Sequence, residues 1–140
     1  MEDRPKHREV MKVIVDSNAL FVPLQFKIDI FAELEHLLKR RFKLILISAA
    51  KRELETLAAK GTPKMRRESA FALKLSQKCT LVETKTHPLM DTDDAIAKIA
   101  ADEKAIVFTN DEQLRKRLRD ISVPVIYVRQ KSRLEIDGLI

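Results

Sequence analysis

The chain has 140 residues, of which 45% are hydrophobic and 34% charged, and this suits one domain with a single hydrophobic core. Its one cysteine, Cys79, excludes a disulfide within the chain, and no apolar run approaches the ~20 residues of a membrane-spanning helix. Since the polar start MEDRPKHREV does not resemble a signal peptide, we expect a cytoplasmic protein with no membrane partner. The net charge of +6 favours a polyanionic partner such as nucleic acid, although an ordinary surface rich in lysine and arginine explains it equally well.

We expect a flexible tail over residues 1–10 and one domain over residues 11–140. In the domain, short and nearly continuous apolar runs predict strands that are covered on both faces, at residues 12–15, 44–47, 80–83, 105–108 and 125–128. Longer segments with apolar residues at helical spacing predict helices at residues 26–41, 48–60, 63–78, 92–102 and 111–119. Gly61 and Pro63 separate the second of these helices from the third.

This alternation of strands and helices predicts a three-layer α/β sandwich, in which helices cover both faces of a five-stranded parallel sheet. Right-handed crossovers between parallel strands favour the strand order 3-2-1-4-5. In that order the chain reverses its direction of travel across the sheet between strands 1 and 4. Proteins of this class bind ligands at such a switch point, beyond the carboxyl ends of the strands.

Acidic residues occur where these strands end and where helices begin at the same edge. Asp16 follows the first strand, Asp111 follows the fourth, and Asp93 and Asp94 lie in the first turn of the helix that leads into the fourth strand. Glu53 lies at the border of the apolar stripe of its helix, from which it can face the same edge. Taken singly, each acid also has an ordinary structural explanation as a helix cap, a turn residue or an ion-pair partner.

Taken together, these acids indicate a bound cation. Carboxylates that meet at one edge repel one another strongly at close range, and a cation is the simplest way to relieve the repulsion. Ligand sets made only of carboxylate oxygens suit a hard ion, so we expect Mg²⁺ or Mn²⁺. The three histidines, His7, His36 and His87, are scattered along the chain and do not form the pattern of a zinc site.

Four segments of the chain, VIVDSNAL, RELETLA, TDDAIAKIA and VFTND, resemble in this order the motifs of the PIN-domain nuclease family. The resemblance covers nearly all of the chain after residue 10. The closing stretch VPVIYVRQKSRLEIDG is most similar to archaeal relatives of the eukaryotic PIN proteins that act in small-subunit ribosomal RNA maturation. It is less similar to the toxins of toxin–antitoxin pairs.

The resemblance implies a PIN-like fold, RNA cleavage that depends on a divalent metal, and frequent homodimers. It implies metal-binding and catalytic roles for Asp16, Glu53, Asp94 and Asp111. Asp93 is a near neighbour that the family sometimes also uses as a metal ligand, and the sequence does not rank it against Asp94. Supporting polar roles follow for Ser17, Asn18, Thr109 and Asn110.

An acidic site attracts RNA only if cations surround it, and several lysines and arginines are candidates for contacts with phosphate groups. Such contacts give an affinity that falls with salt and depends little on base sequence. A solvated helix face explains the group that begins at Arg115 equally well. The candidates are Lys64, Arg66, Arg67, Arg115, Lys116, Arg117, Arg119, Arg129, Lys131 and Arg133.

The sequence therefore predicts a metal-dependent ribonuclease that acts in ribosomal RNA processing or in RNA turnover, with ribosomal precursor particles as possible partners. Two alternatives remain open at this point. The protein is a toxin that an antitoxin holds in check, or it is a non-catalytic RNA-binding factor of ribosome assembly. Chemistry through an aspartyl phosphate, as in haloacid dehalogenases, is disfavoured because a second aspartate is expected two residues after Asp16, where this chain has Asn18.

Overall fold

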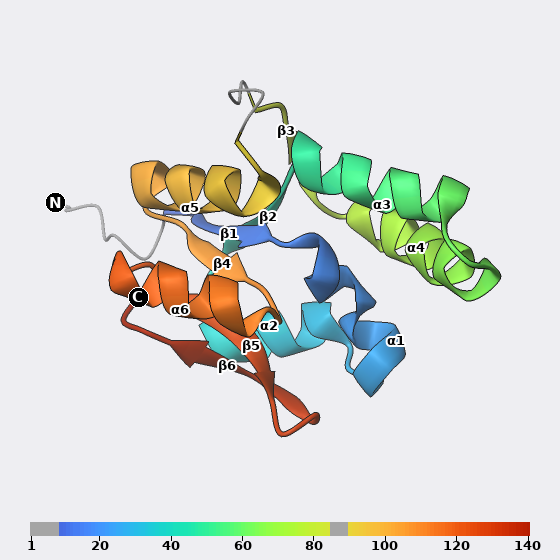
Figure 1. The fold of residues 1–140 in the computed structure, drawn as a ribbon. Helices are drawn as coiled ribbons and strands as arrows, with labels where there is room; N and C mark the ends of the chain where they lie inside the picture. Colours follow the sequence, from blue (N-terminus) through green and yellow to red (C-terminus); the bar gives the residue numbers. More distant parts are fainter. Residues whose placement is uncertain (1–8, 85–89) are drawn as a thin grey trace, which may run out of the picture.

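The computed structural model describes residues 9–84 and 90–140, so most of the predicted tail and His87 lie outside the described residues. Six strands form one sheet in the order β3-β2-β1-β4-β5-β6 (Figure 1). Every contact between the first five strands is parallel, which confirms the predicted order 3-2-1-4-5. The strands are β1 (Met11–Val15), β2 (Phe42–Ile47), β3 (Thr80–Val82), β4 (Ile106–Phe108), β5 (Val125–Arg129) and β6 (Arg133–Asp137).

Helices cover both faces of this sheet, as the α/β pattern predicts. Figure 1 shows α3 and α4 projecting together from one side of the sheet as a helical hairpin. None of the helices in residues 9–84 and 90–140 is long and apolar enough to cross a membrane. The helices are the 3₁₀ helix η2 (Ser17–Phe21), α1 (Val22–Phe26), α2 (Ile30–Leu38), α3 (Ser48–Lys60), α4 (Pro63–Ser76), α5 (Thr92–Glu103) and α6 (Glu112–Asp120).

The sixth strand, β6, is absent from the sequence prediction. It pairs antiparallel with β5 over the whole length of both strands. The turn between them contains Gln130 and Lys131 with φ angles of 53° and 58°, where hairpin sequences usually carry glycine or asparagine. Only Leu134 and Ile136 are apolar in β6, so neither the turn nor the strand stands out in the sequence.

The predicted helix over residues 26–41 is wrong, because this segment belongs to two shorter helices. The first, α1, begins at Val22 and has Pro23 in its first turn, where a missing backbone N–H costs nothing. It ends at Lys27, whose φ of 55° is left-handed. The second, α2, begins after Asp29, whose side chain accepts a hydrogen bond from the Ala32 N–H at 3.2 Å.

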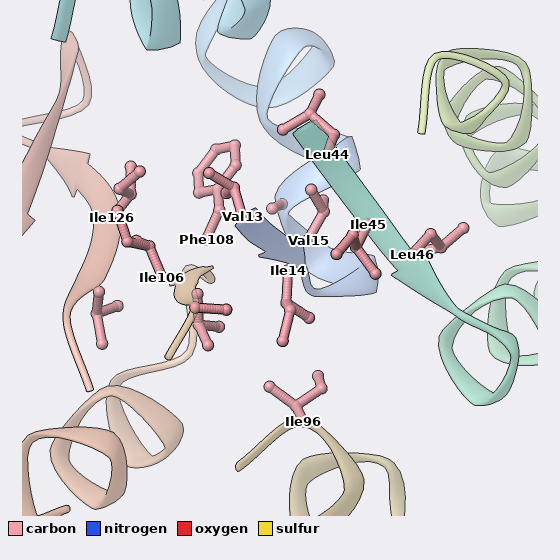
Figure 2. Close-up of a cluster of buried hydrophobic side chains, with 14 of the residues drawn as sticks. Val13, Ile14, Val15, Leu44, Ile45, Leu46, Ile96, Ile106, Phe108 and Ile126 are labelled. Atoms are coloured by element: carbon pink, nitrogen blue, oxygen red, sulfur yellow. The ribbon is translucent and has the colours of Figure 1, made fainter. Parts of the chain in front are cut away.

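The apolar residues of the central strands form a core on each face of the sheet. Figure 2 shows Val13, Val15 and Phe108 on one face and Ile14 on the other, where it points toward Ile96 of α5. All five side chains are fully buried. Burial on both faces explains why these strands read as continuous apolar runs.

The pairing of the central strands continues just beyond their carboxyl ends. The Asp16 N–H donates to the Phe108 carbonyl oxygen at 2.9 Å, and the Thr109 N–H donates to the Ile126 carbonyl oxygen at 3.0 Å. The first bond extends the pairing of β1 with β4, and the second extends the pairing of β4 with β5, so the first polar residues after β1 and β4 both continue the sheet. The backbone thereby fixes Asp16 and Thr109 at the predicted switch point.

Candidate active site

Asp16 is a buried carboxylate at the end of β1, with 4% of its surface exposed. Its Oδ2 atom accepts hydrogen bonds from the Thr109 hydroxyl at 2.7 Å and from the Asn18 side-chain amide at 3.1 Å. Its Oδ1 atom accepts a bond from the Ser17 N–H at 2.8 Å, so it also caps the helix η2. All these donors are neutral groups, and no cation among residues 9–84 and 90–140 forms an ion pair with this carboxylate.

This environment raises the pKa of Asp16 from 3.8 to about 6. Burial is the main cause, since it removes water from the charged form, and the negative charges of Asp93 and Glu53 add to it. The hydrogen bonds from Thr109 and Ser17 favour the charged form and offset part of the rise. The site therefore holds a carboxylate that would be stabilised by a nearby cation.

Glu53 reaches the same edge from the second turn of α3. Its Oε1 atom accepts a hydrogen bond from the Ser17 hydroxyl at 3.1 Å, and its Oε2 atom accepts one from the Thr92 hydroxyl at 2.9 Å. The two bonds connect α3 to η2 and to the first turn of α5. Nothing in the local sequence pattern indicates that Thr92 contacts a residue of another helix.

The paired aspartates of α5 point in different directions. Burial raises the pKa of Asp93, and the negative charges of Asp111, Asp91 and Glu53 raise it further. Asp94 instead forms an ion pair with Arg117 of α6 at 2.6 Å, and this contact lowers the pKa of Asp94. The structure therefore brings Asp93 close to the other acids and turns Asp94 toward a cation outside the cluster.

The geometry of the first turn of α5 explains this difference. Asp91 caps the helix by accepting a hydrogen bond from the Asp94 N–H at 2.8 Å. Consecutive residues of a helix point about 100° apart, so Asp93 and Asp94 cannot face the same group. The cap at Asp91 was not identified from the sequence, although an acid three residues before another is a recognisable signal for a helix start.

Asp111 completes the cluster from the end of β4. Its Oδ1 atom accepts bonds from the N–H groups of Gln113 and Leu114 at 2.8 and 3.3 Å, so it caps α6. Its negative charge is close enough to raise the pKa of Asp93. Asp111 therefore both caps a helix and belongs to the acid cluster.

The predicted supporting residues form a network between the acids. The Thr109 hydroxyl is fully buried, donates to Asp16 and accepts from the Asp111 N–H at 3.1 Å. The Asn18 side-chain oxygen accepts from the Asn110 N–H at 2.9 Å. These bonds lock the ends of β1 and β4 together, so that the carboxylates cannot easily move apart.

The donor chemistry of this cluster fits a hard divalent cation. Asp16, Glu53, Asp93 and Asp111 supply only carboxylate oxygens, and their mutual repulsion is what a cation removes. Among the described residues, however, no three acidic, histidine or cysteine side chains lie close enough as they stand to enclose a metal ion. Binding of a metal therefore requires some of these side chains to move. Both oxygens of Glu53 accept hydrogen bonds from hydroxyl groups in the present arrangement.

The predicted cations divide into two groups. The first group lies on α6 and on the β5–β6 hairpin, and comprises Arg115, Lys116, Arg117, Arg119, Arg129, Lys131 and Arg133. Of these, Arg115, Arg129 and Lys131 line a cleft together with Asp111. The second group, Lys64, Arg66 and Arg67, begins α4 near the outer end of the helical hairpin, away from the sheet (Figure 1). The structure does not bring this second group to the acids.

Comparisons with known proteins agree with this fold. The model of a family described as "PIN like domain" matches residues 13–131. Ribonuclease VapC4 of Methanocaldococcus jannaschii is 33% identical over 92% of this chain and 98% of its own, and ribonuclease VapC9 of Archaeoglobus fulgidus is 28% identical over 98% and 97%. The structure of the PIN domain endonuclease Utp24 matches with a TM-score of 0.76 and 27% identity, over 92% of each chain. The chain belongs to the PIN-like domain family.

Proposed function

We propose that this protein is an endoribonuclease that uses Mg²⁺ or Mn²⁺, with Asp16, Glu53, Asp93 and Asp111 as the ligands and catalytic residues. The observation that carries the proposal is the convergence of these acids from four separate elements around the buried Asp16. Relatives that are named ribonucleases, and whose lengths match almost completely, support the same class of reaction. We place the protein in the cytoplasm, where RNA and divalent metal ions are both available.

A metal ion held by these carboxylates would supply Lewis-acid chemistry, which polarises a phosphodiester and makes water more acidic. The residues of this chain have other tasks. Thr109 and Asn18 hold Asp16 in one orientation by donating to its Oδ2 atom. Ser17 and Thr92 orient Glu53 by donating to its two carboxylate oxygens.

The cations next to the acids would hold the RNA backbone. Arg117 is half exposed and contacts Asp94, which places a guanidinium group at the border of the cluster. Arg115, Arg129 and Lys131 line a cleft together with Asp111, and they extend the basic surface on that side of the cluster. These contacts are with phosphate groups, so they position RNA of any sequence.

Two biological settings suit this activity, and different observations favour each. The names of the VapC relatives, and a solved VapBC2 complex from Rickettsia felis with the same fold (18% identity over 76% of this chain and 92% of that one, TM-score 0.58), favour a toxin that binds an antitoxin. The similarity to Utp24 and the closing stretch of the sequence favour ribosomal RNA processing. A small protein that is encoded by a neighbouring gene and blocks RNA cleavage would establish the toxin role. Homodimer formation stays a prediction, which light scattering checks.

The direct test incubates the purified protein with structured and single-stranded RNAs in Mg²⁺, in Mn²⁺ or in EDTA. We expect internal cleavage with either metal, none in EDTA, and recovery when an excess of Mn²⁺ is added, because carboxylate ligands need the ion. An Asp16→Asn protein purified in the same way controls for contaminating nucleases. Equal cleavage by this variant, or cleavage that EDTA does not affect, would contradict the proposal, and binding without any cleavage would favour an assembly factor.

A further inference from the structure

Two clefts lie on either side of the acid cluster. Glu53, Ser17 and Thr92 help to line a cleft of about 1050 Å³, and Thr109, Asn110 and Asp111 help to line one of about 410 Å³. Asp16 accepts hydrogen bonds from Ser17, which lines the larger cleft, and from Thr109, which lines the smaller one, so it lies between the clefts. An RNA strand with one phosphate at the acids therefore has a nucleotide on each side, and the smaller cleft has the size of a site for one small molecule.

The smaller cleft has a planar cation in its wall. The guanidinium group of Arg115 lies over the ring of Tyr127, with 3.6 Å between its central carbon and the ring centre. Its Nε atom donates to Asp137 at 3.1 Å, and the Tyr127 hydroxyl donates to Glu135 at 3.2 Å. In Figure 1 the helix that carries Arg115, α6, lies beside β5 and β6, which carry these partners.

Hydrogen bonds from both members to carboxylates of β6 restrain this stack. Tyr127 is buried, with 8% of its surface exposed, whereas the Arg115 side chain is 29% exposed and lines the cleft. Both residues line the cleft, and Arg115 is the more exposed of the two. An arginine plane that is fixed by a carboxylate is one of the surfaces on which proteins stack the bases of single-stranded RNA.

The same cleft also contains a cation that is available for a phosphate group. Arg115 and Arg129 line the cleft but are paired with Asp137 and Glu135. Lys131 also lines it, and no carboxylate among the described residues pairs with it. It lies in the tight β5–β6 turn with a left-handed backbone, which fixes the place from which its side chain extends.

We propose that this cleft is a subsite for one nucleotide of single-stranded RNA, adjacent to the phosphodiester that is cleaved. Its base stacks on the outer face of Arg115, and its phosphate binds Lys131. The inference rests on the proposed ribonuclease function and adds to it a defined place for one unpaired base, since a base held in a duplex cannot reach this plane. Bases bind here by stacking, so the subsite accepts all four with modest preference.

The test measures binding of fluorescein-labelled hexaadenylate by anisotropy, in the Asp16→Asn background with Mg²⁺ present, so that the RNA is not cleaved. Arg115→Lys keeps the charge but removes the plane, and we expect binding to weaken about tenfold. Hexaadenylates that lack one base in turn identify the stacked position. The parent in this test is the Asp16→Asn protein. Loss of that base should weaken RNA binding to the parent, but should hardly weaken it further in the Arg115→Lys variant of the same background. Lys131→Gln should lower the slope of log affinity against log salt by roughly 0.7.

Arg119→Lys is the matched control, because Arg119 lies on the same helix and also contacts Asp137, at 3.6 Å, but does not line the cleft. It should bind RNA like the parent, and thermal unfolding verifies that all variants are folded. If Arg115→Lys binds like Arg119→Lys while the wild-type protein cleaves RNA, the subsite is wrong and the proposed function stands. If the wild-type protein cleaves no RNA and the parent binds none, both are wrong.

Discussion

Replacement of Asp16 by asparagine is expected to reduce RNA cleavage by roughly a hundredfold or more, while making the metal-free protein more stable above pH 7. The first effect follows because Asp16 is the most buried acid of the cluster, and loss of even an indirect metal contact typically costs 10- to 100-fold. The second follows because asparagine carries no charge for burial to desolvate, which is a gain of at most about 3 kcal/mol. This gain exceeds the loss of an acceptor at the Oδ2 position, since a hydrogen bond contributes about 1 kcal/mol. The two effects together would identify a residue that is kept for function at a cost in stability.

The pH dependence of stability gives this expectation a sign. The pKa of Asp16 is about 6 in the folded protein and 3.8 ordinarily, so the folded state binds this proton more tightly. The resulting stabilisation is complete below pH 3.8 and is lost as the pH rises through about 6. A difference of this size corresponds to at most about 3 kcal/mol. Asp16→Asn should therefore gain stability relative to the wild type at pH 8 but not at pH 4.

Urea unfolding in EDTA at these two pH values measures the difference, and the same experiment with Mn²⁺ provides a control. Added Mn²⁺ should raise the free energy of unfolding of the wild type at pH 8 and leave that of Asp16→Asn nearly unchanged. If the two proteins differ by the same amount at both pH values, the buried charge of Asp16 has no energetic consequence, and this description of the site is contradicted.

Asp93→Asn and Asp94→Asn form a matched pair with opposite expectations. Asp93 lies near Asp111 and Glu53, so we expect its replacement to lower the rate of RNA cleavage by roughly a hundredfold or more. Asp94 is bound to Arg117, and we expect its replacement to change the rate by less than about tenfold, through the position of this arginine. Rates with saturating metal, and the Mn²⁺ concentration for half-maximal rate, distinguish the two.

The opposite result is equally informative. If Asp94→Asn is the inactive variant and Asp93→Asn is active, the ion pair with Arg117 must open when metal or RNA binds. The metal-binding role that the resemblance implies for Asp94 would then be right, and Asp93 and Asp94 would change their orientation on binding. Circular dichroism of both variants confirms that α5 is still formed.

The fold could be predicted largely because its strands are buried on both faces. Such strands appear as continuous apolar runs, and the alternation with helices together with right-handed crossovers then determines the order. The bounds of α3 could be predicted because Gly61 ends the helix and Pro63 begins the next. The strand β6 could not, because the φ angles of its turn are imposed by pairing with β5 and not by the residues of the turn.

The site could be predicted only in part, for a similar reason. Asp16 and Asp111 could be placed because each follows a strand, and the predicted strand order makes these two strands neighbours. The choice between Asp93 and Asp94 depends on the rotation of α5 about its axis, which is set by packing and by the cap at Asp91. The stack of Arg115 on Tyr127 joins α6 to β5, and Asp137 of β6 holds the arginine in place. No local sequence pattern predicts such a contact.

The central claim is that carboxylates from separate elements gather around one divalent cation. Anomalous diffraction from a crystal soaked in Mn²⁺ tests it most directly, because the signal locates the ion without assumptions about activity. We expect one strong peak, within coordination distance of Asp16 and of at least one of Asp93, Asp111 and Glu53, and no such peak in Asp16→Asn. A fully occupied manganese ion elsewhere on the molecule, with none at Asp16, would contradict this account.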